Sequence, residues 1–113
     1  MKDNVVKDKS LEFAVRIVNL YKFLVNEQKE FVMSKQILRS GTSIGANIRE
    51  AEQAQSRADF INKLNIALKE ANETEYWLEL LIRTEYITRE QYESINNDST
   101  EINKLLISIT VSY

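Results

Sequence analysis

Apolar residues recur every three or four positions in four separate stretches of the chain, which is the spacing of amphipathic α-helices. The stripe of the first stretch consists of Phe13, Ile17, Leu20 and Leu24. It predicts a helix over about residues 9–27, and both Asp8 and Ser10 are suitable N-cap residues for it. The polar stretch 26–30 then suits a connection.

The second stretch predicts a helix over about residues 34–55, with Ser34 as its N-cap. Its inner stripe consists of Ile37, Gly41, Ile44, Ile48 and Ala51. At 100° per residue, Lys35, Arg39 and Arg49 fall within roughly an 80° arc on the opposite side. These three cations therefore predict a small basic face that points outward.

The third stretch predicts a helix from Ser56, which with Asp59 resembles a capping box, to about residue 84. One stripe of this helix consists of Phe60, Leu64, Ala67, Ala71, Leu78 and Ile82. A second apolar side consists of Ile66, Trp77, Leu80 and Leu81. One stripe suffices for a monomeric bundle, so the second side predicts an oligomer interface.

A Thr-x-x-Gln capping box at Thr88 and Gln91 predicts the start of the fourth helix. The stripe of that helix consists of Ile95, Ile102, Leu106 and Ile109. Residues 96–100 are poor helix formers, which predicts a bend or fraying there. Four helices with short connections favour an all-α, up-down-up-down antiparallel four-helix bundle formed by residues 1–113 as a single domain. The alternative is a three-helix body with a mobile fourth segment.

Composition agrees with this fold and excludes several chemistries. The 113 residues include no Pro and two Gly, so helix breakers are few. The chain has no Cys and no His, which argues against zinc sites, Glu-x-x-His di-iron sites and triad-type catalysis. We therefore predict no catalytic residue, no cofactor and no metal. Because no secretory signal or membrane-spanning run is recognisable, we also expect a cytoplasmic protein with no membrane partner.

Gly41 and Gly45 form a small-xxx-small spacing inside the second predicted helix. Each glycine costs about 1 kcal/mol relative to alanine in a helix interior, so a compensating close contact is expected. Close packing of another helix is the favoured interpretation; a ligand or nucleic-acid backbone on this surface, or a simply tolerated weak helix, are the alternatives. The segment is no phosphate loop, since no Gly-Lys-Ser/Thr follows it.

Charge is divided unevenly along the chain, whose net charge is −2. Residues 1–57 carry ten Lys and Arg against seven Asp and Glu, whereas residues 58–113 carry five against ten. The candidate phosphate contacts are Lys35, Arg39, Arg49, Arg57 and Lys63, and a solvated face is their alternative interpretation. A sequence pI near 5.3 argues against tight nonspecific binding by a monomer, but oligomerisation would repeat the basic face.

Acidic residues of the third helix are expected to form a solvated face with helix ion pairs such as Glu79 with Arg83. Glu75 differs, because its angle places it beside the stripe that contains Leu64 and Ile82. A carboxylate in that position should be paired or hydrogen-bonded, so we expect a structural role for Glu75, with an Arg of a neighbouring helix or subunit as one candidate partner.

Two segments, RSGTSIGANIREA and DFINKLNIALKEANETEYWLELL, closely resemble the bacterial four-helix bundle family of proteins encoded in intervening sequences of large-subunit rRNA genes. Members of that family are often labelled ribosomal proteins, and the accessory variability proteins of diversity-generating retroelements are a related branch. The resemblance implies an antiparallel bundle that assembles as a homopentameric ring with a role tied to nucleic acid. In the retroelement branch, the implied partners are a reverse transcriptase and its RNA. That branch is expected to be strongly basic, from which this chain departs.

Two functional hypotheses follow. In the first, the chain is a non-catalytic oligomeric adaptor associated with RNA or DNA. In the second, it is a protein-interaction or scaffold module that binds no nucleic acid.

Overall fold

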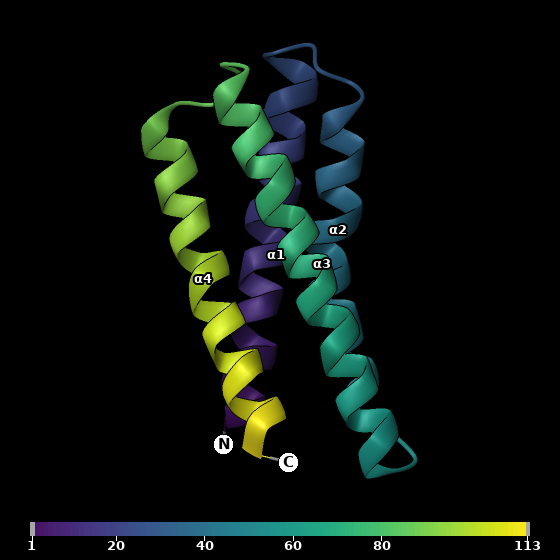
Figure 1. The fold of residues 1–113 in the computed structure, drawn as a ribbon. Coiled ribbons are helices and arrows are strands. Elements are labelled where there is room, and N and C mark those ends of the chain that lie inside the picture. Colours follow the sequence, from purple (N-terminus) through teal and green to yellow (C-terminus); the bar gives the residue numbers. More distant parts are fainter. Residues whose placement is uncertain (1, 113) are drawn as a thin grey trace.

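The computed structural model describes residues 2–112 and the side chains of residues 5–112. Residues 2–112 form four α-helices: α1 (Lys2–Asn26), α2 (Met33–Glu52), α3 (Arg57–Arg83) and α4 (Arg89–Ser112). Each helix packs antiparallel against the next, and α4 closes the bundle against α1 (Figure 1). The all-α antiparallel four-helix bundle is thus confirmed, and α4 is a full member of it.

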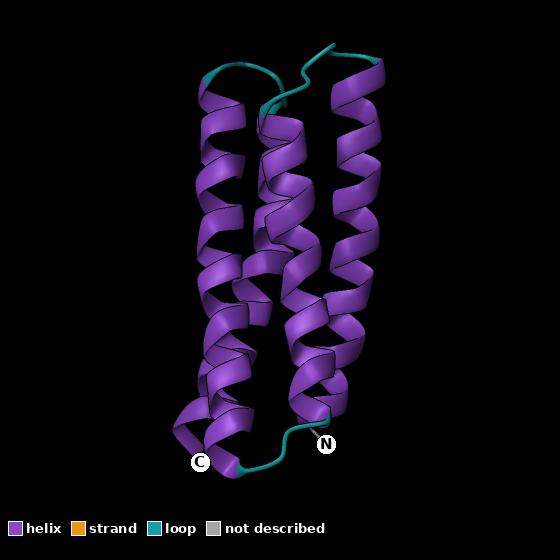
Figure 2. Ribbon diagram, turned by 90° about the vertical axis from the view of Figure 1, so that its right-hand side faces the viewer, coloured by secondary structure: helices purple, strands orange, loops and turns teal. Residues whose placement is uncertain are grey.

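The bundle measures 44 × 21 × 19 Å. The α1–α2 and α3–α4 loops lie together at one end, and the α2–α3 loop lies at the other end near both termini (Figures 1 and 2). None of the helices in the described part of the chain is both long and apolar enough to span a membrane.

The first helix starts a full two turns earlier than the sequence predicted. It begins at Lys2, because Val6 extends the apolar stripe by one more position and is 1% exposed. Ser10 is therefore an interior residue and caps nothing. Its hydroxyl donates to the Lys7 carbonyl at 2.9 Å, one turn back in the same helix.

The start of α2 is capped by a residue that the sequence pattern placed in the preceding connection. Ser34 is not the N-cap; Val32 holds that position and makes no side-chain cap. The carboxylate of Glu30 instead accepts hydrogen bonds from the backbone N–H groups of Val32, Met33 and Ser34 at 3.2, 3.1 and 2.7 Å. A carboxylate at this position also complements the positive end of the helix dipole.

The caps of α3 and α4 were predicted correctly. Ser56 Oγ accepts from the Asp59 N–H at 3.1 Å. At α4, the Gln91 N–H donates to Thr88 Oγ1 at 3.1 Å, and the Thr88 N–H donates to Gln91 Oε1 at 2.8 Å. Both pairs place a side-chain acceptor three residues from a free amide, which the local sequence alone can specify.

The polar run at residues 96–100 is helical without interruption, so the fraying predicted there is wrong. Ile95, Ser99 and Ile102 are buried on the inner side of α4. Packing therefore overrides the weak helix propensity of the run. In addition, the Thr100 hydroxyl donates to the Asn96 carbonyl at 2.9 Å within the helix.

Close helix packing occurs on both sides of α2. A Cβ at Gly41 would lie 2.7 Å from Ile17 Cγ1 of α1, and one at Gly45 would lie 3.3 Å from Ser10 Oγ. On the other side, Ser40 faces α3, where the Thr74 hydroxyl donates to Ser40 Oγ at 3.0 Å in the buried interface. Small residues thus let α2 approach two helices at once.

Candidate functional site

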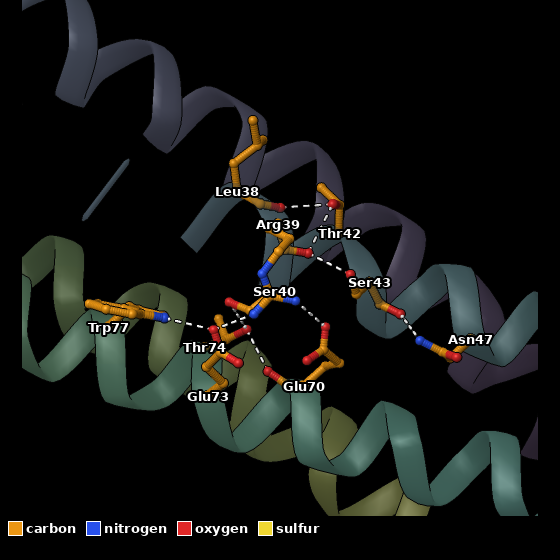
Figure 3. A network of polar contacts seen from close by, with 10 residues as sticks. All are labelled: Leu38, Arg39, Ser40, Thr42, Ser43, Asn47, Glu70, Glu73, Thr74 and Trp77. Atoms are coloured by element: carbon orange, nitrogen blue, oxygen red, sulfur yellow. Dashed lines mark hydrogen bonds and ion pairs between the residues drawn. The ribbon is translucent and has the colours of Figure 1, made fainter. Parts of the chain in front are cut away.

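Two of the five cations predicted to contact phosphate already have carboxylate partners. Arg39 Nη1 lies 2.9 Å from Glu70 Oε2, and Arg39 Nη2 also pairs with Glu73 (Figure 3). Lys63 Nζ lies 2.9 Å from Glu50 Oε1. These ion pairs bridge α2 and α3, so the fold itself neutralises Arg39 of the predicted basic face and the neighbouring candidate Lys63.

Lys35 and Arg49 remain exposed, and neither forms an ion pair with a carboxylate of residues 5–112. They lie near opposite ends of α2, about 21 Å apart along the helix axis at 1.5 Å per residue. Arg57 is exposed at the start of α3, near the Arg49 end. These cations therefore belong to two helices, and Lys35 lies at the opposite end of the bundle from Arg49 and Arg57, so they do not form one cluster.

Arg39 belongs to a polar network that fixes the orientation of Trp77. The Trp77 indole N–H donates to Glu73 Oε2 at 3.0 Å, and Arg39 binds the same carboxylate (Figure 3). The Trp77 hydrogen bond and then the Arg39 hydrogen bond lower the pKa of Glu73 below its ordinary value. The pKa of Arg39 is raised above its ordinary value, chiefly by the hydrogen bond that Arg39 donates to Glu73. The network holds one aromatic ring in place at the edge of the α2–α3 interface.

The predicted oligomer interface divides between surface and core. Ile66, Trp77 and Leu80 are partly exposed, but Leu81 is 0% exposed and belongs to the core of the bundle. At this last turn of α3 the chain folds back, because the Tyr86 N–H donates to the Leu81 carbonyl at 2.9 Å. Leu81 is therefore not available to a neighbouring subunit, contrary to the sequence interpretation.

Tyr76 belongs to the same outer side of α3 and was missed by the sequence analysis. Its side chain is 60% exposed, and its ring meets that of Trp77 edge-on with 5.0 Å between centroids. Its position beside Trp77 could have identified it. It was missed because tyrosine is left out when only apolar residues are placed by helical angle. Together, Ile66, Tyr76, Trp77 and Leu80 form the apolar part of this surface.

Glu75 has partners other than the predicted Arg. Its Oε2 atom accepts a hydrogen bond from the Ser99 hydroxyl at 3.4 Å and another from the Asn103 side-chain amide, both from α4. Glu75 thus has the structural role that was expected, between α3 and α4, but through Ser and Asn side chains instead of an Arg. The expected ion pair of Glu79 with Arg83 is present, with 3.4 Å between Oε2 and Nε.

A cavity of about 490 Å³ opens at the end of the bundle that carries the α2–α3 loop. Its apolar lining consists of Val6, Ile48, Ala51, Ala54, Phe60, Leu64 and Ile109. Of its polar lining residues, Glu52 pairs with Lys7 at 3.1 Å and Ser56 caps α3. With Arg57 as the remaining polar side chain among the described residues, the lining offers no matched general acid and base.

Two further apolar patches escaped the sequence analysis, which recorded mainly inward stripes. Leu11 and Val15 are half-exposed on the outer side of α1. Phe31 and Val32 are 53% and 73% exposed in the α1–α2 loop. The angular count could have found the first patch, whereas the second lies outside any helical period.

Comparison with known proteins identifies the family of this chain. The pattern of the 23S rRNA-intervening sequence protein family matches residues 2–108. A 1.70 Å crystal structure of a protein with unknown function, from the S23 ribosomal protein family of Bacteroides thetaiotaomicron VPI-5482, is 99% identical in sequence. It superposes with a TM-score of 0.97 and the match covers 97% of this chain and 98% of that one. No curated protein matches. The chain therefore belongs to the family of 23S rRNA-intervening sequence proteins.

Proposed function

We propose that this chain is a non-catalytic, self-associating four-helix bundle that acts as a nucleic-acid-associated adaptor. The observation that carries the proposal is the state of Lys35 and Arg49 on the outer edge of α2. Both are exposed, and the fold uses neither in an ion pair within residues 5–112. Cations with this placement are available for phosphate groups.

Self-association is the second part of the proposal. A chain with a net charge of −2 attracts a polyanion weakly, but copies arranged in a ring repeat the same two cations around it. The partly exposed side formed by Ile66, Tyr76, Trp77 and Leu80 supports assembly, because aromatic residues are enriched in the buried centres of interfaces. The ring of five that the resemblance implies is the assembly we propose.

The proposal of a non-catalytic role is supported by how the fold uses its polar side chains. The carboxylates of Glu70, Glu73 and Glu75 bind Arg, Trp, Ser or Asn side chains of the bundle itself. Of the three polar residues that line the cavity at the α2–α3 loop, Glu52 serves an ion pair and Ser56 a helix cap. Such groups stabilise the fold, and none of these sets pairs a nucleophile with a base.

Nucleic-acid binding is tested with a double variant, Lys35→Ala with Arg49→Ala, titrated against total bacterial RNA. The double variant is expected to bind RNA more weakly. The slope of its log K against log salt should also be shallower, by roughly 0.7–0.9 for each phosphate contact that is lost. The matched control is Lys69→Ala with Lys104→Ala, which removes the same charge from exposed cations on α3 and α4. If both double variants lost the same RNA affinity, the effect would come from overall charge alone, which would contradict a defined basic edge on α2.

A protein-interaction module is the second candidate, favoured by the Tyr76–Trp77 pair. The indole of Trp77 is fixed by Glu73, so this aromatic pair is preorganised for a partner surface. Salt-insensitive capture of a protein, with no nucleic acid retained at low salt, would support this candidate over the adaptor.

A further inference from the structure

The loop between α1 and α2 displays two neighbouring apolar side chains to solvent. Phe31 is 53% exposed and Val32 is 73% exposed, at the end of the bundle where the α1–α2 and α3–α4 loops meet (Figure 1). An aromatic and a β-branched residue side by side on a loop tip are unfavourable in water unless a ligand covers them.

The loop holds this display rigidly. The buried carboxylate of Glu30 accepts three backbone N–H groups at the start of α2, and the Glu30 N–H donates to the Leu24 carbonyl at 2.9 Å. The Gln28 side-chain amide donates to the Tyr86 carbonyl at 2.9 Å, which ties the loop to the α3–α4 connection. Phe31 therefore protrudes from a fixed backbone, which is the arrangement of a preorganised binding residue.

Backbone strain marks the same loop. Lys29 adopts φ 56°, in the left-handed region that side-chain-bearing residues rarely occupy. This conformation turns the chain so that Glu30 points inward to cap α2 while Phe31 and Val32 point outward. Glu85 after α3 adopts φ 65°, so both loops at this end of the bundle leave a helix through a left-handed residue.

Three lysines belong to the same end of the bundle as the exposed pair: Lys22 lies near the end of α1, Lys29 in the loop and Lys35 in the first turn of α2. Lys22, Lys29 and Lys35 are exposed, and none of them forms an ion pair with a carboxylate of residues 5–112. Of the two acids in the loop, Glu30 is occupied by backbone amides and Glu27 is exposed. The loop and the adjoining helix ends therefore combine an exposed aromatic ring with three lysines against two acids, and the neighbouring α3–α4 loop adds the exposed Glu85.

We propose that this tip, formed by Lys22, Lys29, Phe31, Val32 and Lys35, binds a single-stranded segment of nucleic acid. An unpaired base stacks on the Phe31 ring, and the lysines contact the flanking phosphates. A single strand fits better than a duplex, since base faces are covered inside a duplex and a protruding ring cannot reach them. The inference rests on the proposed nucleic-acid association and adds its site and strand preference.

The test uses the full chain and a fluorescein-labelled 12-nucleotide oligouridine, with a duplex of the same length beside it. Phe31→Ala is expected to weaken oligouridine binding by about 5- to 150-fold, the loss typical of one stacked base, with little effect on the duplex. Phe31→Trp is expected to restore binding, and its added indole emission should be quenched by oligouridine. Leu11→Ala, which truncates a similarly exposed residue on α1, is the matched control and should bind as the wild type.

Salt dependence separates stacking from charge. Each phosphate contact with a single strand contributes roughly −0.7 to the slope of log K against log salt. With three lysines at the phosphates, the slope should therefore be no steeper than about −2. Phe31→Ala should leave this slope unchanged, whereas Lys29→Ala should make it shallower by about 0.7. Both variants alter exposed side chains, and an unchanged circular dichroism melting curve checks that each one folds.

The possible failures are distinguishable. If the wild-type chain binds neither oligouridine, duplex nor total RNA at low salt, the proposed function fails and this inference with it. If the Lys35→Ala, Arg49→Ala variant loses RNA binding while Phe31→Ala keeps full oligouridine affinity, the stacking site is overturned and the adaptor stands. Phe31-dependent binding to phosphatidylserine vesicles, with no binding to oligouridine, would overturn the site in favour of a lipid surface.

Discussion

Several residues of this bundle have roles that residue type and sequence position alone do not predict. Arg39 looks like a cation for a ligand, yet two carboxylates of α3 hold it. Glu30 looks like a loop residue, yet it caps α2 through three backbone amides. In both cases the partner belongs to another element or to the backbone, so the local sequence pattern carries no signal for it. The unpaired Lys35 is the opposite case, because exposure on the outer arc alone identified it correctly as a surface cation.

The Glu73 carboxylate makes the stability of the bundle depend on pH. Its pKa is lowered by the Trp77 indole N–H and by Arg39, so its stabilising contribution is present above the ordinary glutamate pKa and is lost as pH falls through the lowered value. We expect the wild type to be more stable than Glu73→Gln at pH 7, and this difference to be smaller at pH 3, which lies below the ordinary glutamate pKa. Urea unfolding of both proteins at the two pH values, followed by Trp77 emission, measures it. A difference that is the same at both pH values would show that the charge of Glu73 is irrelevant.

At the scale of elements, the sequence predicted the fold class and all four helices because each carries a stripe of period 3.6. The caps at Ser56 and Thr88 were predictable, since donor and acceptor lie three residues apart in the chain. The earlier start of α1 and the intact helix at residues 96–100 were not, because burial against other helices decides both. The same limit applies to the candidate site, where the ion pairs of Arg39 and Lys63 join α2 to α3.

The packing of α2 on α1 predicts different outcomes for its two glycines. A Cβ at Gly41 would lie 2.7 Å from Ile17 Cγ1, so overpacking should cost about 1–3 kcal/mol, offset by about 1 kcal/mol of helix propensity. Gly41→Ala should therefore lower the free energy of unfolding by up to about 2 kcal/mol. Gly45→Ala, with its nearest contact at 3.3 Å, should be neutral or slightly stabilising. Chemical denaturation of both variants measures these free energies of unfolding. If both substitutions stabilised the protein equally, close packing at Gly41 would be contradicted.

The molecule as a whole combines an acidic net charge with surfaces suited to association. Among its exposed cations without an ion pair in residues 5–112, Lys35 and Arg49 lie on α2 and Lys22 and Lys29 lie near or in the α1–α2 loop, while the Tyr76–Trp77 pair lies on α3. One copy offers few phosphate contacts, so the proposed adaptor depends on several copies that act together. Membership of the 23S rRNA-intervening sequence protein family was evident from the segments 39–51 and 59–81, whereas assembly and nucleic-acid association remain proposals.

Light scattering coupled to size-exclusion chromatography, with and without total bacterial RNA, tests the adaptor account most directly. For the ring of five, the chain of 13.2 kDa should elute at low micromolar concentration with a mass near 66 kDa. With RNA at low salt, protein and RNA should elute together, and raising the salt should release the RNA while the ring persists. A 13.2-kDa monomer that elutes apart from RNA at every salt concentration would contradict the account.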